Sequence, residues 1–596
     1  MIVKMKKLIL LCARNDLDTT LHELRGLGAV HVRHVKAPEG EDLDKARKAL
    51  KYVRRALDVL PKHPDAEPSG RGGYAVIEDV WKLIMEREET EEHLEDLRHE
   101  RKRIQPFGDF DPESARRLAE YGIHVKLYQT GPKKERPEHS ENSLLVELNR
   151  DKEGIYYALI TREGDEELDA QEMRLPTMSL GTVEEKISSM EDTLAKNEEN
   201  FASHAGDRSA VEEIVTGIQE RVEYLETRSG MGLEEPVAYL QGYLPLDRVE
   251  DIEAAAAANG WGFTLDDPAE DEKPPTLIRN PSWIQIIKPV FDFMGISPGY
   301  REVDISFFFL VFLSIFFGMI VGDAGYGAIF LASTLAFGKK LKKMSPLIVP
   351  LLAVMSVCTI IWGALQGQYF SMAVTPPAFR SIEVGWLSNN DNLMYVCFLI
   401  GSIHITIAHG WNVIRYINSL QALAQVGWIC TTWFMFFVIR TMVLGGQWSN
   451  YYFILLGIGV VLIALFMTPW KQLKSEWFNH VMLPLDIISN FVDVVSYVRL
   501  FAVGLATYAV GNAFNSMALG GGVDGILAGI AAALVLFLGH ALNIVMSIMS
   551  VLVHGIRLNT LEFSGHLGME WTGEKFQPFE AKLADESKRE IESLGE

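Results

Sequence analysis

Long stretches without any charged residue dominate the sequence after residue 305. Between residues 305 and 338 the only charged residue is Asp323, and the segments 345–379, 392–414, 416–439, 441–470, 500–523 and 525–556 contain none. A helix needs about 20 apolar residues to cross the hydrocarbon core of a bilayer. We therefore expect an all-α polytopic membrane domain over residues 301–580, with eight spans at about 303–321, 324–338, 346–368, 391–414, 420–443, 450–469, 484–518 and 524–563.

The first 300 residues contain charged residues throughout, which predicts a separate, water-exposed part of a multi-domain chain. The formal net charge of −22 falls mainly on this part and argues against a nucleic-acid partner. Residues 1–36 and 235–266 each show a strand, a helix and a second strand. Because two such units can share one sheet, we expect these segments to form a split α/β lobe.

Between these segments the sequence predicts a long helical hairpin with a second lobe at its far end. Helical patterns cover about 41–105 and 182–230, and the second would reach roughly 70 Å as one continuous helix. Residues 106–178 mix one helix with three strand-like runs. We interpret residues 1–300 as a cytoplasmic arm with a proximal lobe (1–40 and 235–290), an antiparallel coiled coil (41–105 and 182–230) and a distal lobe (106–178). The alternative is an ordinary α/β domain with long helices.

Clusters of positive charge indicate how the spans are oriented. Lysines and arginines gather at 339–343, at Arg415 and at 471–474. If eight spans follow a cytoplasmic N-terminal half, all three clusters lie inside, as the positive-inside rule requires. We therefore expect a multi-pass protein of the cell membrane whose C-terminus, including a tail at 581–596, is also cytoplasmic.

The last two predicted spans are too long for a vertical crossing and carry aligned polar residues. They would measure about 52 Å and about 60 Å, and because no proline interrupts residues 485–577 we expect tilted, unbroken helices. Polar residues recur at steps of three and four, which places them on one helix face. On the last span they are His540, Asn543, Ser547, Ser550, His554 and Arg557, and on the preceding span they are Asp486, Ser489, Asp493 and Ser496, followed by Arg499.

We interpret these aligned side chains as a hydrophilic ion path through the membrane. The alternative is interhelical hydrogen bonding that only holds the helices together. Among these residues, Arg499 is the one whose placement inside the membrane costs the most free energy. A charge at bilayer depth costs roughly 2.5 kcal/mol or more, and arginine keeps its charge at any usable pH. Its alternatives are a buried pair with Asp493 or extension to the membrane surface, and the second alternative applies to Arg557 as well.

Five sequence blocks occur in the order typical of one protein family. They are "FFGMIVGDAGYG" (316–327), "SYVRLFAVGLA" (496–506), "GHALN" (539–543), "VHGIRLNTLEF" (553–563) and "GEKFQPF" (573–579). Over essentially its whole length the chain resembles the large membrane subunit of rotary V/A-type ATPases, called subunit a or subunit I. Asp486, thirteen positions before Arg499, is similar to the archaeal and bacterial branch. Thr507 and Ser547 stand where eukaryotic relatives have a histidine and a glutamate.

The resemblance implies a stator subunit that faces a proteolipid ring whose helices each carry one carboxylate. It implies two aqueous half-channels for protons, separated by Arg499, with Arg557 as the second arginine. The implied half-channel lining is Asp486, Asp493, Ser496, Thr507, His540, Asn543, Ser547, Ser550, His554 and Glu562. The implied partners are the proteolipid c-ring, peripheral stalk subunits at the N-terminal lobes, a central-stalk subunit and the lipid bilayer.

Other sequence features limit which functions are compatible with this interpretation. No GxxxxGK[ST] motif for nucleotide phosphates occurs, so we expect a non-catalytic subunit of an ATP-driven or ATP-synthesising complex, with no cofactor. A sodium-translocating version of the same subunit remains an alternative. A secondary transporter would favour inverted repeats, which the sequence lacks, and a non-conducting membrane scaffold would use the polar residues only for packing.

Overall fold

The structure, a computed structural model of the chain, describes residues 1–62, 68–132, 134–162, 166–372, 377–469, 474, 477–520, 522 and 525–581. Backbone contacts divide the chain into two compact units. One unit contains Met1–Leu10, Ala29–Val32 and Gln241–Pro578, and the other contains Leu11–Gly28, Arg33–Leu240 and Phe579–Glu596. The expected tail lies outside the described residues except for its first residue, and so does most of the cationic cluster at 471–474.

Two strand-helix-strand segments contribute to one five-stranded sheet. The first supplies β1 (Met5–Ala13), α1 (Leu17–Leu27) and β2 (His31–Arg33), and the second supplies β8 (Val237–Pro245), α7 (Val249–Asn259) and β9 (Gly262–Asp266). The strand order is β2-β8-β1-β9, with β7 (Gly232–Glu234) beside β8. Both helices end at a glycine in the left-handed conformation, Gly28 at φ 56° and Gly260 at φ 68°, which glycine adopts at little cost. The predicted sharing of one sheet is confirmed.

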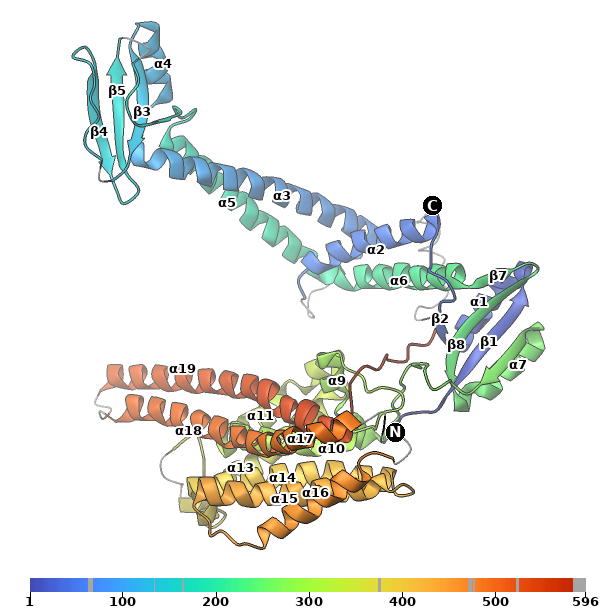
Figure 1. Cartoon of the computed structure of the whole chain (residues 1–596). Coiled ribbons are helices and arrows are strands. Elements are labelled where there is room, and N and C mark those ends of the chain that lie inside the picture. Colours follow the sequence, from blue (N-terminus) through green and yellow to red (C-terminus); the bar gives the residue numbers. More distant parts are fainter. Residues whose placement is uncertain are drawn as a thin grey trace. The chain divides into compact units, whose positions relative to one another are not determined.

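A second sheet forms from strands β3 (His124–Thr130), β4 (Leu144–Arg150), β5 (Ile155–Thr161) and β6 (Gln171–Met173), in the order β4-β5-β3-β6. The inner strand β5 is almost wholly buried, as its run of apolar residues predicts. Helix α4 (Pro112–Glu120) packs against β3 (Figure 1), and its N-cap residue Asp111 accepts a hydrogen bond from the backbone N–H of Glu113. The predicted helix and three strands are present, and β6 is additional.

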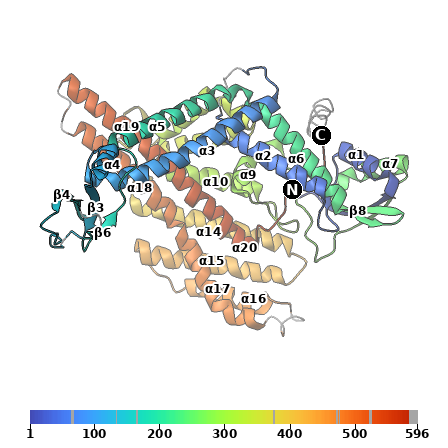
Figure 2. The same cartoon turned by 90° about the horizontal axis from the view of Figure 1, so that it is seen from above.

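Four long helices connect these regions along the sequence. They are α2 (Glu41–Val59), α3 (Gly73–Ile104), α5 (Leu180–Ser203) and α6 (Arg208–Gly230). Helix α3 lies beside α5, and α2 lies beside α6 (Figures 1 and 2). Apolar residues at helical spacing are buried where α2, α3 and α6 meet, among them Val76, Val80, Val211 and Ile218.

The prediction of one continuous helix over 182–230 is wrong, because residues 204–207 interrupt it. The reason is the buried carboxylate of Asp207, whose two oxygens accept hydrogen bonds of 2.7 Å from the backbone N–H and the hydroxyl of Ser69. Ser69 lies in the connection between α2 and α3. The interruption therefore gives Asp207 donors that a straight helix would leave out of reach.

The remaining part of the chain is helical. Its helices before residue 470 are α8 (Ser282–Gln285), α9 (Lys288–Met294), α10 (Ser306–Val321), α11 (Ala324–Ala336), α12 (Gly338–Met344), α13 (Ile348–Gln366), α14 (Asn390–Arg415), α15 (Gln421–Leu444) and α16 (Tyr452–Phe466). Helices α14, α15 and α16 lie side by side (Figures 1 and 2). These bounds fall close to the first six predicted spans.

Five helices in the described part of the chain are long and apolar enough to cross a membrane. They are Ile348–Gln366, Asn390–Arg415, Gln421–Leu444, His480–Leu519 and Ile526–Leu567. The other three predicted spans coincide with the apolar helices α10, α11 and α16, of 16, 13 and 15 residues. These are shorter than the roughly 20 residues of a vertical crossing.

The last two predicted spans form helices α17 (Trp477–Ser496), α18 (Val498–Leu519) and α19 (Ile526–Ser550). The expected long helix over 484–518 is present within His480–Leu519, but it is interrupted at one residue, Tyr497, because α17 ends one residue before it and α18 begins one residue after it. The backbone nevertheless stays hydrogen-bonded there, from Tyr497 N–H to Val494 and from Leu500 N–H to Tyr497. A chain in lipid needs such bonds because no water replaces them.

The final helix continues beyond α19 through two stretches of π-helix, Val551–Gly555 and Leu558–Phe563, to α20 (Ser564–Leu567). It ends four residues beyond the predicted boundary. Helix α18 lies beside α19 (Figures 1 and 2). The steps of three and four that predicted one polar face assume an α-helix throughout, so they hold only as far as Ser550.

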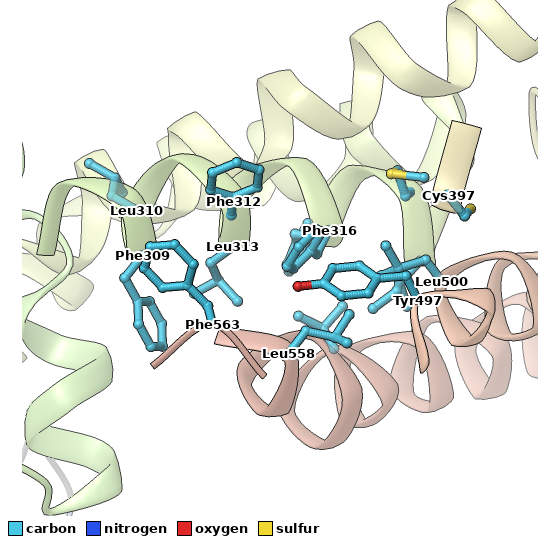
Figure 3. Close-up of a cluster of buried hydrophobic side chains, with 14 of the residues drawn as sticks. Phe309, Leu310, Phe312, Leu313, Phe316, Cys397, Tyr497, Leu500, Leu558 and Phe563 are labelled. Carbon is cyan, nitrogen blue, oxygen red and sulfur yellow. The ribbon is translucent and has the colours of Figure 1, made fainter. Parts of the chain in front are cut away.

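Helix α10 lies at the centre of the hydrophobic core of this part. Figure 3 shows Phe309, Phe312 and Phe316 on one face of α10, directed at Tyr497 and Phe563 of the C-terminal helices. All five side chains are buried, and Phe309, Phe316, Tyr497 and Phe563 are 0% exposed. The aromatic run "SFFFLVFLSIFF" thus packs against residues next to Arg499 and Glu562.

Candidate functional site

Arg499 is the second residue of α18 and faces Glu562 on the last helix. The distance from its Nη2 to Glu562 Oε1 is 3.7 Å, and Arg557 Nε lies 3.9 Å from the same oxygen. The side chain of Glu562 is 5% exposed, that of Arg499 22% and that of Arg557 54%. One buried carboxylate is therefore shared by two arginines, of which Arg499 is the more enclosed.

Asp493 does not pair with Arg499, so that alternative is wrong. Its Oδ2 lies 3.2 Å from Nε2 of His566, a residue of α20. The His566 carbonyl in turn accepts a hydrogen bond of 2.9 Å from Asn412 on α14. Asp493 lies on the preceding helix α17, before the interruption at Tyr497, and Arg499 pairs with Glu562 instead.

We call Arg499, Arg557, Glu562, Asp493, Ser496 and His566 the Arg499 cluster. Ser496 belongs to it through its hydroxyl, which donates to the Asp493 carbonyl at 2.7 Å. Within the described part of the chain, Nη1 of Arg499 and Oε2 of Glu562 are buried without a hydrogen-bond partner. Unpaired buried polar atoms are costly, and here they leave capacity for a further group or for water.

A second group of polar side chains lies farther along α18 and α19. The hydroxyl of Tyr326, at the start of α11, is 2.7 Å from Nδ1 of His540 and accepts a hydrogen bond of 3.0 Å from Asn543. His540 Nε2 lies 3.1 Å from Oδ1 of Asn515 on α18. Asn543 also donates to the Thr507 carbonyl at 2.9 Å. These contacts connect the "GDAGYG" and "GHALN" blocks directly.

We call Tyr326, His540, Asn543, Asn515, Thr507 and Ser547 the His540 cluster. The Ser547 hydroxyl lies 3.5 Å from that of Thr507, and Asn543 and Ser547 are both 1% exposed. The two positions that differ from the eukaryotic pattern are therefore neighbours in space. Gly511 provides room for Ser371 and Asn543, since a Cβ there would lie 2.2 Å from the Ser371 hydroxyl oxygen and 3.1 Å from the Asn543 amide nitrogen.

Asp323 fixes the Tyr326 hydroxyl in this cluster. Its carboxylate is 1% exposed and accepts backbone hydrogen bonds from Gly325 and Tyr326 at the start of α11, and from Phe370 and Ser371 in the loop after α13. The turn before α11 also packs tightly on α13, because a Cβ at Gly363 would lie 2.1 Å from the Ala324 nitrogen. The glycine-rich block is thus a turn with close packing, as the sequence predicts.

A cavity of about 320 Å³ reaches α18 between the two clusters. Its polar wall includes Gln366, Gln368 and Glu383 from the region after α13, and its other wall includes Leu500 and Gly504 of α18. Leu500 follows Arg499 directly. A space of this size and polarity can hold water.

Three of the residues predicted to line the half-channels belong to neither cluster. Asp486 is exposed on α17, and Ser550 and His554 are half-buried on the last helix. Within the described residues the side chains of these three form no hydrogen bond or ion pair. The remaining predicted residues fall into the Arg499 cluster or the His540 cluster.

Sequence reasoning missed Tyr326, Asn515, His566 and also His404, a buried residue of α14. The aligned polar residues gave no signal for them, because their partners lie on other helices. His566 follows Glu562 by four residues, and this helical spacing is the one signal that could have found it.

Comparisons with known proteins cover nearly the whole chain, although no family model matches it. The chain is 30% identical to V-type ATP synthase subunit I 1 of Treponema pallidum, over 97% of this chain and 100% of that protein. It is 28% identical to V-type ATP synthase subunit I of Borreliella burgdorferi, over 97% of this chain and 99% of that protein.

More distant likenesses carry similar names. A-type ATP synthase subunit I of Methanocaldococcus jannaschii is 28% identical over 59% of this chain and 56% of its own length. A crystal structure of the cytoplasmic N-terminal domain of subunit I, homolog of subunit a, of V-ATPase covers 44% of this chain and 99% of its own, at 15% identity and a TM-score of 0.22, which is too low to bear on the fold. The full-length match to the Treponema protein decides the assignment: the chain belongs to the family of V-type and A-type ATP synthase subunits I.

Proposed function

We propose that the chain is the stator subunit that carries protons across the membrane in a rotary V/A-type ATPase. Two aqueous half-channels meet the proteolipid ring, and Arg499 separates them. A fixed guanidinium stabilises the ionised ring carboxylate as it passes and blocks direct leakage from one half-channel to the other. A lysine there could lose its proton when desolvated, whereas arginine cannot.

The observation that carries this proposal is the position of Arg499 at the start of α18, inside one polar cluster and with a second polar cluster farther along the same helix. The Arg499 cluster contains two contacts between ionisable side chains. Arg499 contacts Glu562, and Asp493 contacts His566. The His540 cluster is a separate hydrogen-bonded group on the same two helices. The cavity lined by Leu500, Gly504 and Tyr508 supplies space for water along α18, from the residue that follows Arg499. Two separate polar regions on the same helices, one of which contains Arg499, suit two half-channels.

The rest of the chain fits the same role. We propose that residues 301–580 cross the membrane eight times and that residues 1–300 form a cytoplasmic stator arm with a coiled coil. Peripheral stalk subunits would bind its two lobes and resist the torque of rotation, while the tail at 581–596 stays in the cytoplasm. The subunit itself performs no catalysis, and the ATP chemistry belongs to other subunits of the complex.

The test is ATP-driven acidification of vesicles that contain the assembled complex, with the subunit content measured on the same vesicles. We expect Arg499→Gln to assemble and to lose pumping. Arg440→Gln is the matched control, because Arg440 lies on α15 over the ring of Tyr395 and away from both clusters. Pumping that survives in Arg499→Gln contradicts the proposal, and wild-type transport that needs sodium and produces no acidification changes the ion.

A further inference from the structure

Tyr497, two residues before Arg499, is held by helix α14. Its hydroxyl lies 2.9 Å from Nδ1 of His404, and both side chains are 0% exposed. A Cβ at Gly401, one turn earlier on α14, would lie 2.4 Å from the Tyr497 ring. Gly401 therefore makes room for the ring and His404 binds its hydroxyl. Figure 3 shows this ring between Phe316 and Leu558.

His404 also contacts Phe563, the residue that follows Glu562, on the last helix. Its ring stacks on Phe563, the residue after Glu562, at a centroid distance of 4.2 Å and an angle of 10°. Its ring also stacks on Phe312 of α10 at 3.7 Å. One side chain thus contacts a close sequence neighbour of Arg499 and a close sequence neighbour of Glu562.

Packing alone does not require a histidine at this position. The surroundings are aromatic, and Nε2 of His404 is buried without a hydrogen-bond partner among the described residues. A phenylalanine would fill a similar volume without that cost. What histidine adds is a polar atom for the Tyr497 hydroxyl at the interruption between α17 and α18.

We propose that His404 and Gly401 form a socket for Tyr497 that fixes the start of α18 and thereby sets the position of Arg499 relative to Glu562. His404 is a positioning residue, since it touches neither the arginine nor the transported ion. Without the hydrogen bond, the turn at residue 497 has no side-chain anchor at a point where the helix is already interrupted. Arg499 then samples positions in which it separates the two half-channels less well.

The expected defect is uncoupling, which follows from the proposed function. A misplaced arginine lets ions leak while ATP hydrolysis continues, so the number of protons pumped per ATP falls. The measurement is this ratio in vesicles with the assembled complex, together with the passive proton leak. Both are normalised to the amount of assembled subunit.

Tyr497→Phe removes one oxygen and keeps the ring, and His404→Phe keeps an aromatic ring and removes the acceptor. We expect each to lower the coupling ratio about fivefold, the effect of one buried hydrogen bond, and to raise the leak. The double variant should be no worse than either single variant, because both remove the same bond. Ser402→Ala, another fully buried polar residue of α14, is the control and should couple normally.

Three results would overturn the socket. One is a normal coupling ratio in both single variants, and another is a double variant whose defect is the product of the two. The third is reduced assembly with normal coupling in the complexes that form, which would give His404 a structural role only. Arg499→Gln in the same assay separates this inference from the proposed function. If that variant still pumps, the proposed function fails, whereas its loss of pumping beside normally coupled His404→Phe overturns only the socket.

Discussion

Two buried aspartates precede helices in different surroundings, and they are satisfied to different degrees. Asp207 lies before α6 in the N-terminal half and is 2% exposed, while Asp323 lies before α11 in the part with the candidate membrane spans and is 1% exposed. Asp207 accepts two hydrogen bonds, both from Ser69. Asp323 accepts four, all from backbone N–H groups.

The difference follows from what surrounds each carboxylate. Asp207 has donors from a single residue, the backbone N–H and the hydroxyl of Ser69. In the membrane-spanning part a buried charge depends on protein donors alone, and the start of α11 together with the loop at Phe370 and Ser371 provides them. Both residues in that loop have positive φ values, 53° and 52°, which are strained for non-glycine residues. The four hydrogen bonds offset that strain.

The largest effect in this comparison is expected at Asp323. Asp323→Ala leaves four buried N–H groups without an acceptor, and at about 1–3 kcal/mol each this exceeds the roughly 4 kcal/mol that marks an exceptional substitution. We expect almost no assembled subunit in membranes, as measured by subunit content. Asp323→Asn keeps one carbonyl oxygen and should recover part of the assembly. Normal assembly of the alanine variant would show that the loop holds itself in place.

A smaller effect is expected at Asp207. Asp207→Ala removes the acceptors of the Ser69 N–H and of the Ser69 hydroxyl, which costs about 1–3 kcal/mol. The readout is hydrogen exchange in the assembled complex, where amides of residues 68–72 should exchange faster. Ser203→Ala, a change to a nearby exposed hydroxyl that bonds only within its own helix, serves as the control. Equal exchange in both variants would mean that the interruption does not depend on the carboxylate.

The smallest effect is expected at Asp18, an exposed aspartate of α1. Arg228 donates a hydrogen bond to it at 2.7 Å, and mainly this bond lowers the pKa of the Asp18 carboxyl below its usual value. Its stabilisation is therefore present above about pH 4, the ordinary pKa of aspartate, and is lost as the pH falls through the lowered pKa.

Because the Asp18 side chain is 62% exposed, solvent screening limits the effect of Asp18→Asn at neutral pH to at most about 0.5 kcal/mol. Thermal unfolding between pH 7 and pH 3 should show the difference from wild type shrinking toward the acid end. A difference that grows on acidification would reverse the assigned sign.

Local sequence patterns predicted the elements that depend on neighbours along the chain. The apolar run "LILLCA" predicted β1, Gly26 or Gly28 was expected near the end of α1, and the charge-free runs predicted α13, α14 and α15 nearly to the residue. Asn543 and Ser547, two of the aligned polar residues on the last span, are buried, and so is Glu562, which the family resemblance added. These patterns indicate which side chains of a helix or strand are buried, and each pattern lies within a short stretch of sequence.

The errors occurred where a distant partner decides the structure. Nothing near residue 207 reveals that Ser69 binds Asp207, and nothing near Tyr497 reveals that His404 on α14 receives its hydroxyl. The pairing of Asp493 with His566 was missed for the same reason. Helical periodicity describes one helix at a time, so it can identify polar faces without identifying which of them meet.

The two π-helical stretches of the last helix have a consequence for how this sequence can change in evolution. Each α-helical residue turns the chain by about 100°, and a π-helical turn holds one extra residue without advancing that rotation. Deleting one residue within such a π-helical turn would restore an α-helical turn and leave the orientation of α20, and with it His566 beside Asp493, nearly unchanged. A deletion in the α-helical part of α19 would instead turn everything after it by about 100°, so single-residue deletions should be tolerated better between Val551 and Phe563 than before Ser550.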